Sequence, residues 1–175
     1  MKLREAVIQD VEKLVDLVNS AYRGDFSKKG WTTEAELLGG QRIDRQSVID
    51  QMKLKDSVIL VYEQEPKILA CVFLSKKDSR TAYLGMFTVH PELQGQGLGK
   101  HVLSTAEDFC RREWGIQVVE MTVIRQRPEL IAWYERRGYE RTGRTEDFPY
   151  GDERFGIPKR DELVMEVLTK MLSAF

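Results

Sequence analysis

Apolar residues recur along this chain with two different periods, and the changes of period mark its elements. Helical spacing predicts one helix directly after Asp10, a candidate N-cap, and a second from about Gly99 to Gly115. The apolar faces of these helices are Val11, Leu14, Val15, Val18 and Tyr22 in the first and Val102, Leu103, Ala106, Phe109 and Cys110 in the second. A shorter helix is predicted over 128–137, where a proline suits the first turn and the next glycine suits the stop.

Strand-like runs lie between these helices. They are predicted over 3–6, 57–62, 68–74, 81–89, 118–124, 139–142 and 163–168. The three runs between 57 and 89 are separated by short turns and form an antiparallel meander. The stretch 23–45 is the least periodic and is interpreted as a loop with a short helix over 33–38, followed by a helical piece over 47–54. With no internal repeat and no linker, residues 1–175 are predicted to form one mixed α/β domain.

The composition of the chain argues against several classes of function. The 175 residues carry a net charge of −1 without a block of Lys or Arg, so nucleic-acid binding is not expected. No apolar stretch approaches the roughly 20 residues of a membrane span, and the first residues lack a signal-peptide core. Cys71 and Cys110 lie in apolar runs without metal-ligand spacing, which predicts buried free thiols and fits a reducing cytoplasm. With only two histidines, His90 and His101, no metal site is expected.

The segment MFTVHPELQGQGLGKHVL joins a strand that ends at Val89 to a helix that opens near Leu98. The first backbone N–H groups of a helix have no internal partners, and the helix dipole adds partial positive charge there. Gly95, Gly97 and Gly99 lack the side chains that would hold a phosphate away from these donors. This order predicts a pyrophosphate cradle, and the alternative is a flexible turn that binds nothing.

Two better-known phosphate motifs do not fit this turn. A P-loop needs GxxxxGK[ST], but Gln94 stands at its first glycine and His101 at its Ser/Thr. The dinucleotide fingerprint GxGxxG would need a glycine at Lys100. The run QGQGLG instead matches the signature Q/R-x-x-G-x-G/A, and through it the sequence resembles the GNAT acetyltransferase superfamily.

A second landmark supports this resemblance. The stretch PELIAWYERRGY looks like the GNAT helix that ends in Y-x-x-x-G-[FY], with Tyr134 at the tyrosine and Gly138 and Tyr139 at the final pair. The order of elements along the chain is also similar. The resemblance implies an α/β GNAT fold, with a central mixed, mostly antiparallel twisted sheet and helices on both faces. The sequence departs from the family at Arg127, where relatives often have Asn, and in the strand 83–89, which has no carboxylate to act as a base.

The resemblance also implies an activity, namely direct transfer of an acetyl group from acetyl-CoA to an amine within a ternary complex. In the family the pantetheine arm pairs with strand backbone, here the main chain of residues 87–89, and an N–H near Val89 is a candidate oxyanion donor. Trp133 is either core or a wall of the acyl channel. The residues predicted to bind the cofactor are Phe87, Thr88, Val89, Gln94, Gly95, Gln96, Gly97, Leu98, Gly99, Lys100, Leu130 and Trp133.

Acid–base chemistry selects further candidates. A lysine-like amine has a pKa of about 10.4 and must lose a proton to a carboxylate, a histidine or a water chain before it attacks. A departing thiolate, with a thiol pKa near 8.5, leaves more easily if it is protonated. Tyr134 is the candidate general acid, since a phenol donates without carrying positive charge, and the alternative is a tyrosine that is merely packed. His90 is interpreted as a cap of the strand end rather than as a base.

The acceptor pocket is predicted to lie over 22–44, with Tyr22, Trp31 and Glu34 as candidate substrate residues. Glu34 is the candidate for proton removal or amine recognition. The alternative is a helix start that is capped by Thr32 or Thr33. In that case Glu36 completes a capping box with Thr33, and Glu34 is left free. Arg125 is predicted either to hold an anionic group of the substrate or to pair with an acid.

The sequence does not identify the acceptor, so amino acids, polyamines, antibiotics and protein N-termini all stay open. The protein is expected to be a monomer or homodimer that acts on a small-molecule or peptide amine. One rival interpretation is a non-catalytic acyl-CoA sensor, against which Tyr134 argues. Another is a nucleotide-binding interaction module, which the two failed phosphate motifs disfavour.

Overall fold

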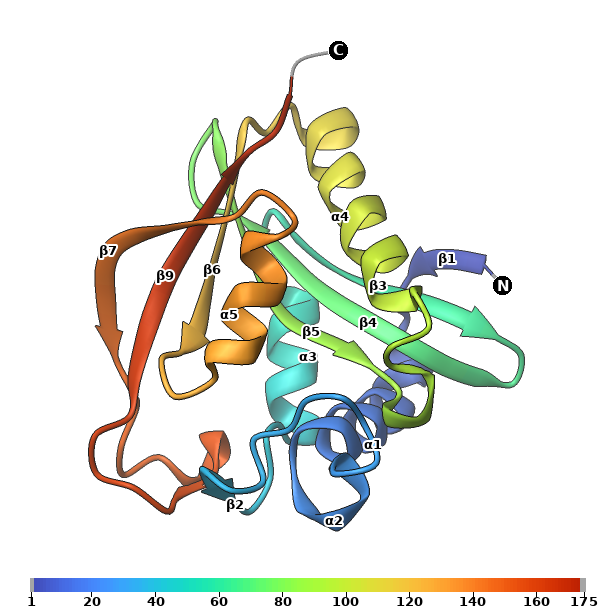
Figure 1. Cartoon of the computed structure of the whole chain (residues 1–175). Coiled ribbons are helices and arrows are strands. Elements are labelled where there is room, and N and C mark those ends of the chain that lie inside the picture. The colour runs from blue at the N-terminus through green and yellow to red at the C-terminus, as the bar shows by residue number, and fades with distance from the viewer. Residues whose placement is uncertain (1, 174–175) are drawn as a thin grey trace.

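Seven strands form one twisted sheet in the order β1-β3-β4-β5-β6-β9-β7 (Figure 1). The computed structural model describes residues 2–173. The strands are β1 (Lys2–Glu5), β3 (Ser57–Gln64), β4 (Lys67–Lys76), β5 (Thr81–Val89), β6 (Val118–Ile124), β7 (Glu140–Asp147) and β9 (Val164–Met171). Neighbouring strands are antiparallel except for β5 and β6, so the predicted mixed, mostly antiparallel sheet is confirmed.

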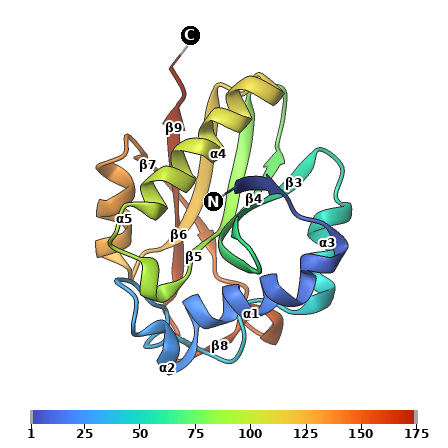
Figure 2. The same ribbon diagram turned by 90° about the vertical axis from the view of Figure 1, so that its right-hand side faces the viewer.

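Helices cover both faces of the sheet, as predicted (Figure 2). The helices α4 and α5 pack on one face, and α1 and α3 pack on the other. Their bounds are Val11–Tyr22 for α1, Arg45–Lys53 for α3, Leu98–Trp114 for α4 and Pro128–Glu135 for α5, with a single turn, α2, at Gly24–Ser27. Cys71 and Cys110 are buried free thiols, as expected. Within residues 2–173 no helix has both the length and the apolar composition to cross a membrane.

The continuous apolar run of β4 explains the two helical layers. Ala70, Val72 and Leu74 belong to the core under α4, whereas Cys71 and Phe73 belong to the core under α1. Successive side chains of a strand point to opposite faces, so an uninterrupted apolar strand must be buried on both. The sheet therefore needs helices on each side to remove this strand from water.

An extra residue in β5 changes the direction of the strand just before the glycine-rich turn. The register between β4 and β5 shifts between Cys71 and Phe73, where three steps along β5 match two along β4. Met86 takes up this bulge with a φ of 49°, in the left-handed region. Because side chains alternate along a strand, the extra residue directs Phe87 and Val89 toward the core under α4.

The helix predicted over 33–38 is wrong. Residues 35–37 form a turn, and β2 (Leu38–Gly39) then pairs with β8 (Ile157–Pro158) in a second, two-stranded sheet. The hydroxyl of Thr33 accepts a hydrogen bond from the N–H of Ala35, which favours a local turn over a continuing helix. The predicted capping box is therefore absent, and the short helix of this region is α2 instead.

The two aspartates that precede helices behave differently. Asp10 lies before α1, but its carboxylate accepts hydrogen bonds from Val7 N–H at 2.8 Å and from Arg4 at 2.6 Å. The prediction that Asp10 caps α1 is therefore wrong, and the Arg4 guanidinium holds the pKa of this carboxyl below its ordinary value. Asp44 does cap α3, since it accepts from the N–H of Ser47 at 2.7 Å. The different behaviour of the two aspartates follows from the local geometry of the chain before each helix.

Leu103 tests the buried face of α4. It is 2% exposed and packs between α4 and the sheet. Leu103→Ala is expected to lower the free energy of unfolding by about 2–5 kcal/mol, because it leaves a cavity in this core. Urea denaturation measures the loss, and Ser104→Ala on the exposed side of the same turn serves as the control, with a change within about 0.5 kcal/mol. Equal losses in the two variants would contradict this packing.

Candidate functional site

The strands β5 and β6 separate in the middle of the sheet. Their parallel ladder joins only residues 81–83 to residues 118–120. Beyond it, within the described chain, no ladder connects the remainder of β5 (84–89) with that of β6 (121–124), and we call this separation the splay. Two cavities open along the splay, one toward α4 and α5 and the other toward β7 and the loop after α1. The site is therefore a gap that the sheet itself provides.

The first cavity has a volume of about 320 Å³ and lies between the end of β5, the glycine-rich turn and α5. Most residues predicted to bind the cofactor line it, namely Phe87, Thr88, Val89, Gln94, Gly95, Gly97, Gly99, Lys100, Leu130 and Trp133. Two others do not: Leu98 packs against the core, and the exposed Gln96 donates a hydrogen bond to the carbonyl of Glu92. The cavity thus contains strand backbone at one end and a helix N-terminus at the other.

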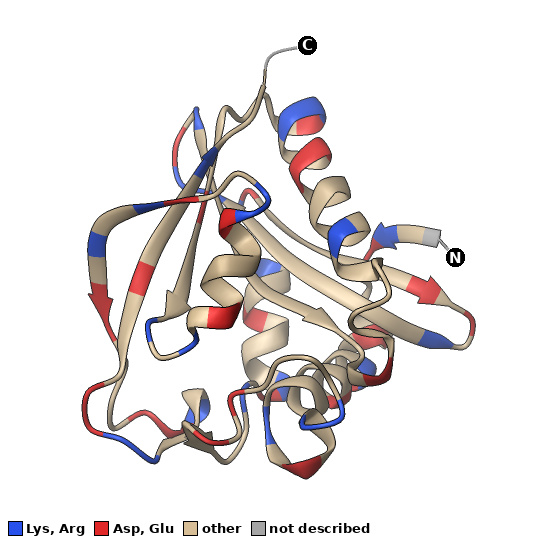
Figure 3. Ribbon diagram, in the orientation of Figure 1, with Lys and Arg blue, Asp and Glu red and all other residues tan. Residues whose placement is uncertain are grey.

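The start of α4 has the geometry of a phosphate cradle. Gly95 and Gly97 have φ values of 76° and 88°, and a Cβ at either position would meet no other atom within 4 Å. The first backbone hydrogen bond of α4 runs from the N–H of His101 to the carbonyl of Gly97, so the three amides before His101 have no intrahelical acceptor. The first turn contains Lys100 and no acidic residue (Figure 3). These donors and this charge suit a pyrophosphate.

Gln94 connects the turn to the loop after α1. Its side-chain amide donates to the carbonyl of Val89 at 3.1 Å, and its oxygen accepts from the N–H of Thr32 at 3.2 Å. The loop passes so close that a Cβ on Gly30 would lie 2.5 Å from the Gln94 oxygen. Gln94 therefore fixes the edge of the first cavity in addition to lining it.

Aromatic side chains form the wall of the first cavity. Trp133 lies 6.1 Å from Phe87 and 6.5 Å from Trp31, measured between ring centroids, and Tyr134 lies 5.1 Å from Trp133. The Arg137 guanidinium covers Trp133 at 3.4 Å from its centroid. Both interpretations of Trp133 fit the structure, since its side chain lines the cavity and also packs against the core.

Tyr134 lies where the two cavities meet. It is 5% exposed and lines both of them. Among residues 2–173, no group forms a hydrogen bond with its hydroxyl. Burial raises the pKa of Tyr134 well above its ordinary value, so the phenol keeps its proton at neutral pH. The structure thus places at the boundary of both cavities a protonated phenol that has no hydrogen-bond partner among the described residues.

The second cavity has a volume of about 350 Å³ and shares five residues with the first. These are Tyr22, Phe87, Arg127, Leu130 and Tyr134. Part of its wall is apolar and comes from β2, β6, β9 and the segment after β7, through Leu38, Met121, Ile124, Met165 and Phe148. The hydroxyl of Tyr22 donates to the carbonyl of Phe87 at 2.7 Å, which anchors α1 to the bulge of β5.

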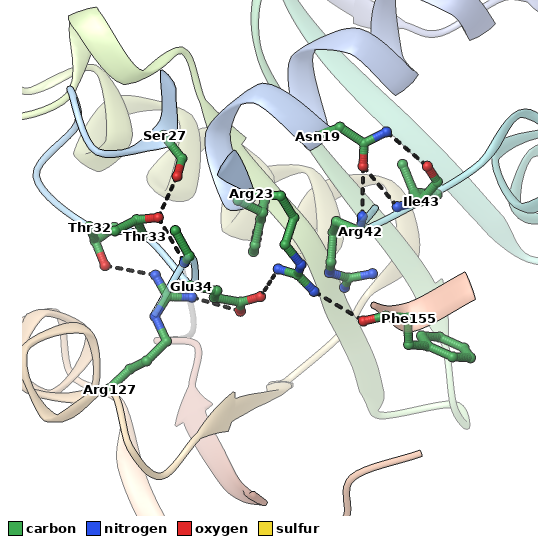
Figure 4. A network of polar contacts seen from close by, with 12 residues as sticks. Asn19, Arg23, Ser27, Thr32, Thr33, Glu34, Arg42, Ile43, Arg127 and Phe155 are labelled. Carbon is green, nitrogen blue, oxygen red and sulfur yellow. Dashed lines mark hydrogen bonds and ion pairs between the residues drawn. The ribbon is translucent and has the colours of Figure 1, made fainter. Parts of the chain in front are cut away.

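Glu34 lies between two arginines at the edge of this cavity (Figure 4). One carboxylate oxygen accepts from Arg127 at 2.8 Å and the other from Arg23. Arg127 also donates to the hydroxyl of Thr32 at 2.7 Å, and Arg23 donates to the carbonyl of Phe155 at 3.0 Å. All three members of this triad are at most 6% exposed. The triad joins α1, the loop after it and the start of α5.

The expectation that Glu34 is free of partners is wrong, because both of its oxygens bind guanidinium groups. Burial alone would raise the pKa of Glu34, but the charges of Arg127 and Arg23 outweigh it and hold the pKa below its ordinary value. A carboxylate with a lowered pKa is a weak proton acceptor. This environment favours a positioning role for Glu34 over that of a base.

The remaining candidate substrate residues lie in different places. Trp31 is 47% exposed and lines the first cavity, and Tyr22 lines both. Arg125 lines neither cavity and donates to Glu166 at 2.6 Å, so of its two interpretations the structure supports the ion pair. The N–H of His90 donates to the carbonyl of Leu69 and extends the end of the strand. No group of three or more His, Cys, Asp and Glu in residues 2–173 is placed to hold a metal ion.

Sequence reasoning missed three contributors to the cavities. Arg127 and Arg137 flank α5 and line the first cavity, and Arg42 lines the second. The spacing of Trp133 and Arg137, four residues apart, is a signal that could have placed this arginine over the ring. For Arg42 no such signal exists, because its position depends on how the loop folds back onto α1.

The sequence places the chain in a family. A sequence model described as the acetyltransferase (GNAT) family matches residues 12–139, which include the glycine-rich turn, the splay and Tyr134. The chain belongs to the GNAT acetyltransferase family. As a GNAT protein it is an acyltransferase, and the characterised members that it resembles are N-acetyltransferases.

Two curated GNAT relatives come from Bacillus subtilis (strain 168). S-alkylcysteine N-acetyltransferase is 26% identical over 147 residues, which cover 78% of this chain and 77% of that protein. S-(2-succino)cysteine N-acetyltransferase is 26% identical over 149 residues, which cover 81% of this chain and 86% of that protein. Both names describe transfer to the nitrogen of a substituted cysteine.

Solved structures share the fold of this GNAT chain. Ribosomal-protein-S18-alanine N-acetyltransferase from Escherichia coli superposes with a TM-score of 0.70 at 14% identity, over 99% of this chain and 95% of that one. A spermidine N-acetyltransferase mutant from Vibrio cholerae gives 0.67 at 14% identity, over 98% and 95%. At this identity the likeness shows the fold alone.

Glu34 and Glu36 form a matched pair for testing the triad. Glu34→Gln is expected to lower the free energy of unfolding by about 3–5 kcal/mol, because it leaves two buried guanidinium groups uncompensated. Glu36→Gln is expected to change it little, since Glu36 is exposed and pairs with Lys28 at the surface. Thermal and urea unfolding measure both. Equal effects of the two substitutions would contradict the buried triad.

The triad also predicts a pH dependence. The folded pKa of Glu34 lies below its ordinary value, so its contribution to stability is complete above the unfolded pKa of about 4.3 and is lost as the pH falls through the folded pKa. The difference in stability between wild type and Glu34→Gln should therefore be constant from pH 6 to 8 and decrease in acid. A difference that grows on acidification would contradict the sign of this shift.

Proposed function

We propose that this chain is an acetyl-CoA-dependent N-acetyltransferase, which transfers the acetyl group directly from a donor in the first cavity to an amine in the second. The observation that carries the proposal is that both cavities meet at Tyr134, whose hydroxyl is protonated and has no partner in the described protein. A direct transfer needs donor and acceptor on either side of one point. On this proposal residues 1–175 act as one catalytic domain.

The first cavity fits the donor at both of its ends. The amides and the lysine at the start of α4 suit the pyrophosphate, and the open space above Gly95 and Gly97 leaves room for it. Within residues 2–173 no strand pairs with the edge of β5 that faces the splay over residues 87–89, and this edge suits the amides of a pantetheine arm, which can pair with it as an added strand. The aromatic wall around Trp133 then shields the thioester from water.

Tyr134 is the general acid of the proposed transfer. The neutral amine attacks the thioester carbonyl carbon, the new C–N bond forms, and the C–S bond breaks. Tyr134 donates its proton to the departing sulfur, and its raised pKa ensures that this proton is present at neutral pH. The acceptor ammonium first loses one proton to water, because the two arginines that pair with Glu34 make this carboxylate a weak base. After the attack the nitrogen loses a second proton, which returns through water to the Tyr134 phenolate and restores the acid.

The second cavity favours a small amine with an apolar body. Its side walls include Met121, Ile124, Phe148 and Met165, which suit an aliphatic or thioether group rather than a polar chain. The two curated relatives, which are named for substituted cysteines, support an acceptor of this kind. Glu34 contributes indirectly, by keeping Arg23 and Arg127 in the cavity wall.

The two ends of α4 provide a matched test of the cradle. Gly97 and Gly115 both have left-handed backbones, with φ values of 88° and 68°, and a Cβ on either would meet open space. Alanine at each should cost about 1–2 kcal/mol of stability through backbone strain. Only Gly97→Ala should weaken acetyl-CoA binding in calorimetry, by roughly tenfold or more, because the turn must shift its N–H donors. Equal acetyl-CoA affinity in the two variants would exclude the cradle.

The two tyrosines of the second landmark separate catalysis from packing. Tyr134→Phe should lower kcat by about 10²-fold or more with little change in KM, because a general acid acts in the transition state. Tyr139→Phe removes a hydroxyl that donates to Glu107 at 3.0 Å and lines neither cavity, so it should lower stability and leave kcat unchanged. CoA release from acetyl-CoA with a panel of amines measures both. Full turnover by Tyr134→Phe would remove this residue from the mechanism, and binding without turnover in the wild type would favour a sensor.

A further inference from the structure

Arg42 is a cation of the second cavity that forms no ion pair or side-chain hydrogen bond with a carboxylate of residues 2–173, although its charge acts on the nearby Glu34. It is half-buried, lines the cavity, and its guanidinium lies over the ring of Tyr22 at 5.4 Å. Within residues 2–173 no carboxylate or carbonyl oxygen accepts a hydrogen bond from this guanidinium. A planar guanidinium that rests on an aromatic ring keeps its N–H edge available for a bidentate contact with a carboxylate.

The backbone of Arg42 is held in place by α1. The side-chain oxygen of Asn19 accepts from the N–H of Arg42 at 2.7 Å and from that of Ile43 at 3.1 Å, and its amide donates to the carbonyl of Ile43 at 2.9 Å (Figure 4). This clamp and the ring of Tyr22 restrict the arginine before any ligand binds. A preorganised side chain loses less entropy on binding than a mobile surface arginine.

The charges around the second cavity are arranged unevenly. The charged residues that line it are Arg23, Glu34, Arg42, Arg127, Glu146 and Asp147. The three arginines and Glu34 are buried or half-buried and together carry a net charge of +2, whereas the two β7 acids are exposed. This positive group of side chains attracts an anionic group and disfavours a polycation.

Arg42 also lies near the point of transfer. The ring of Tyr22 contacts the guanidinium of Arg42, and the hydroxyl of the same Tyr22 donates to the carbonyl of Phe87. The Phe87 ring lies 6.4 Å from that of Tyr134, between centroids. Two aromatic side chains therefore separate the arginine from the general acid. Because Arg42 and Tyr134 line the same cavity, one small acceptor can reach both if it carries its amine and its anionic group within the length of that cavity.

We propose that the acceptor is an α-amino acid with an apolar side chain, and that Arg42 binds its carboxylate while its amine faces Tyr134. This proposal rests on the proposed N-acetyltransferase function and specifies its substrate class. The α-carbon carries both the amine and the carboxylate, so one small molecule presents both groups within this cavity. The apolar walls receive the side chain. Polyamines have no carboxylate, and in a peptide the carboxylate lies at least one residue away from the amino group.

The first test compares S-methylcysteine with its carboxamide. The carboxamide keeps the amine and the side chain and removes the negative charge. Arg42→Gln should lower kcat/KM for the amino acid roughly ten- to a hundredfold, chiefly through KM, because it removes a charge-assisted hydrogen bond. It should leave kcat/KM for the carboxamide unchanged. Arg42→Lys should recover part of the loss, since an ammonium supplies charge without the bidentate fork.

Arg45→Gln is the matched control. Arg45 lies three residues further along, is 61% exposed at its side chain and pairs with Glu12 outside both cavities. This substitution should leave kcat/KM unchanged both for S-methylcysteine and for its carboxamide. Acetyl-CoA binding by calorimetry should be the same in wild type and all three variants, because Arg42 does not line the first cavity.

The possible outcomes test the proposed substrate class and the proposed function separately. Equal losses for acid and carboxamide in Arg42→Gln, or a higher kcat/KM for spermidine or a dipeptide than for S-methylcysteine, would overturn the carboxylate site and leave the acetyltransferase intact. An absence of CoA release with every amine, while acetyl-CoA still binds, would overturn the proposed function and this inference with it.

Discussion

The short parallel ladder between β5 and β6 is the constraint on which the rest of the site depends. It spans three residues of each strand, and beyond it the bulge at Met86 turns the end of β5 away from its neighbour. A parallel pair that stops early leaves one strand edge free and a gap in the sheet. Both cavities occupy this gap, and α5 with the loop after α1 closes it around them.

The buried triad of Arg23, Glu34 and Arg127 is the second requirement. It connects segments that are far apart in the chain and brings the loop after α1 against the start of α5. Burying three charges is unfavourable unless each is paired, so the loop is held in one geometry by the cost of separating them. Gln94 adds a neutral link from the same loop to the glycine-rich turn. The two cavities therefore share one support.

Local sequence signals were sufficient for most of the fold. The helix faces, the meander and the glycine stops follow from periodicity and backbone preference, and they were predicted within a few residues. The wrong predictions are those in which a side chain forms a hydrogen bond with a distant or unexpected partner. Thr33 bonds to a nearby backbone N–H and ends a helix that propensity favoured, and Asp10 turns back to Arg4 instead of capping α1.

The sequence by itself determined the glycine-rich turn, the tyrosine of α5 and the chemistry that these residue types allow. The turn and the tyrosine could be recognised because each belongs to a motif with short-range spacing. The tertiary structure decided the environment of each charge. Glu34 is a buried partner of two arginines and Arg125 pairs with Glu166, whereas Arg42 lies over Tyr22 and forms no ion pair within residues 2–173. Electrostatic pairing acts through space between residues that are distant in the sequence, so it cannot be predicted from spacing along the chain.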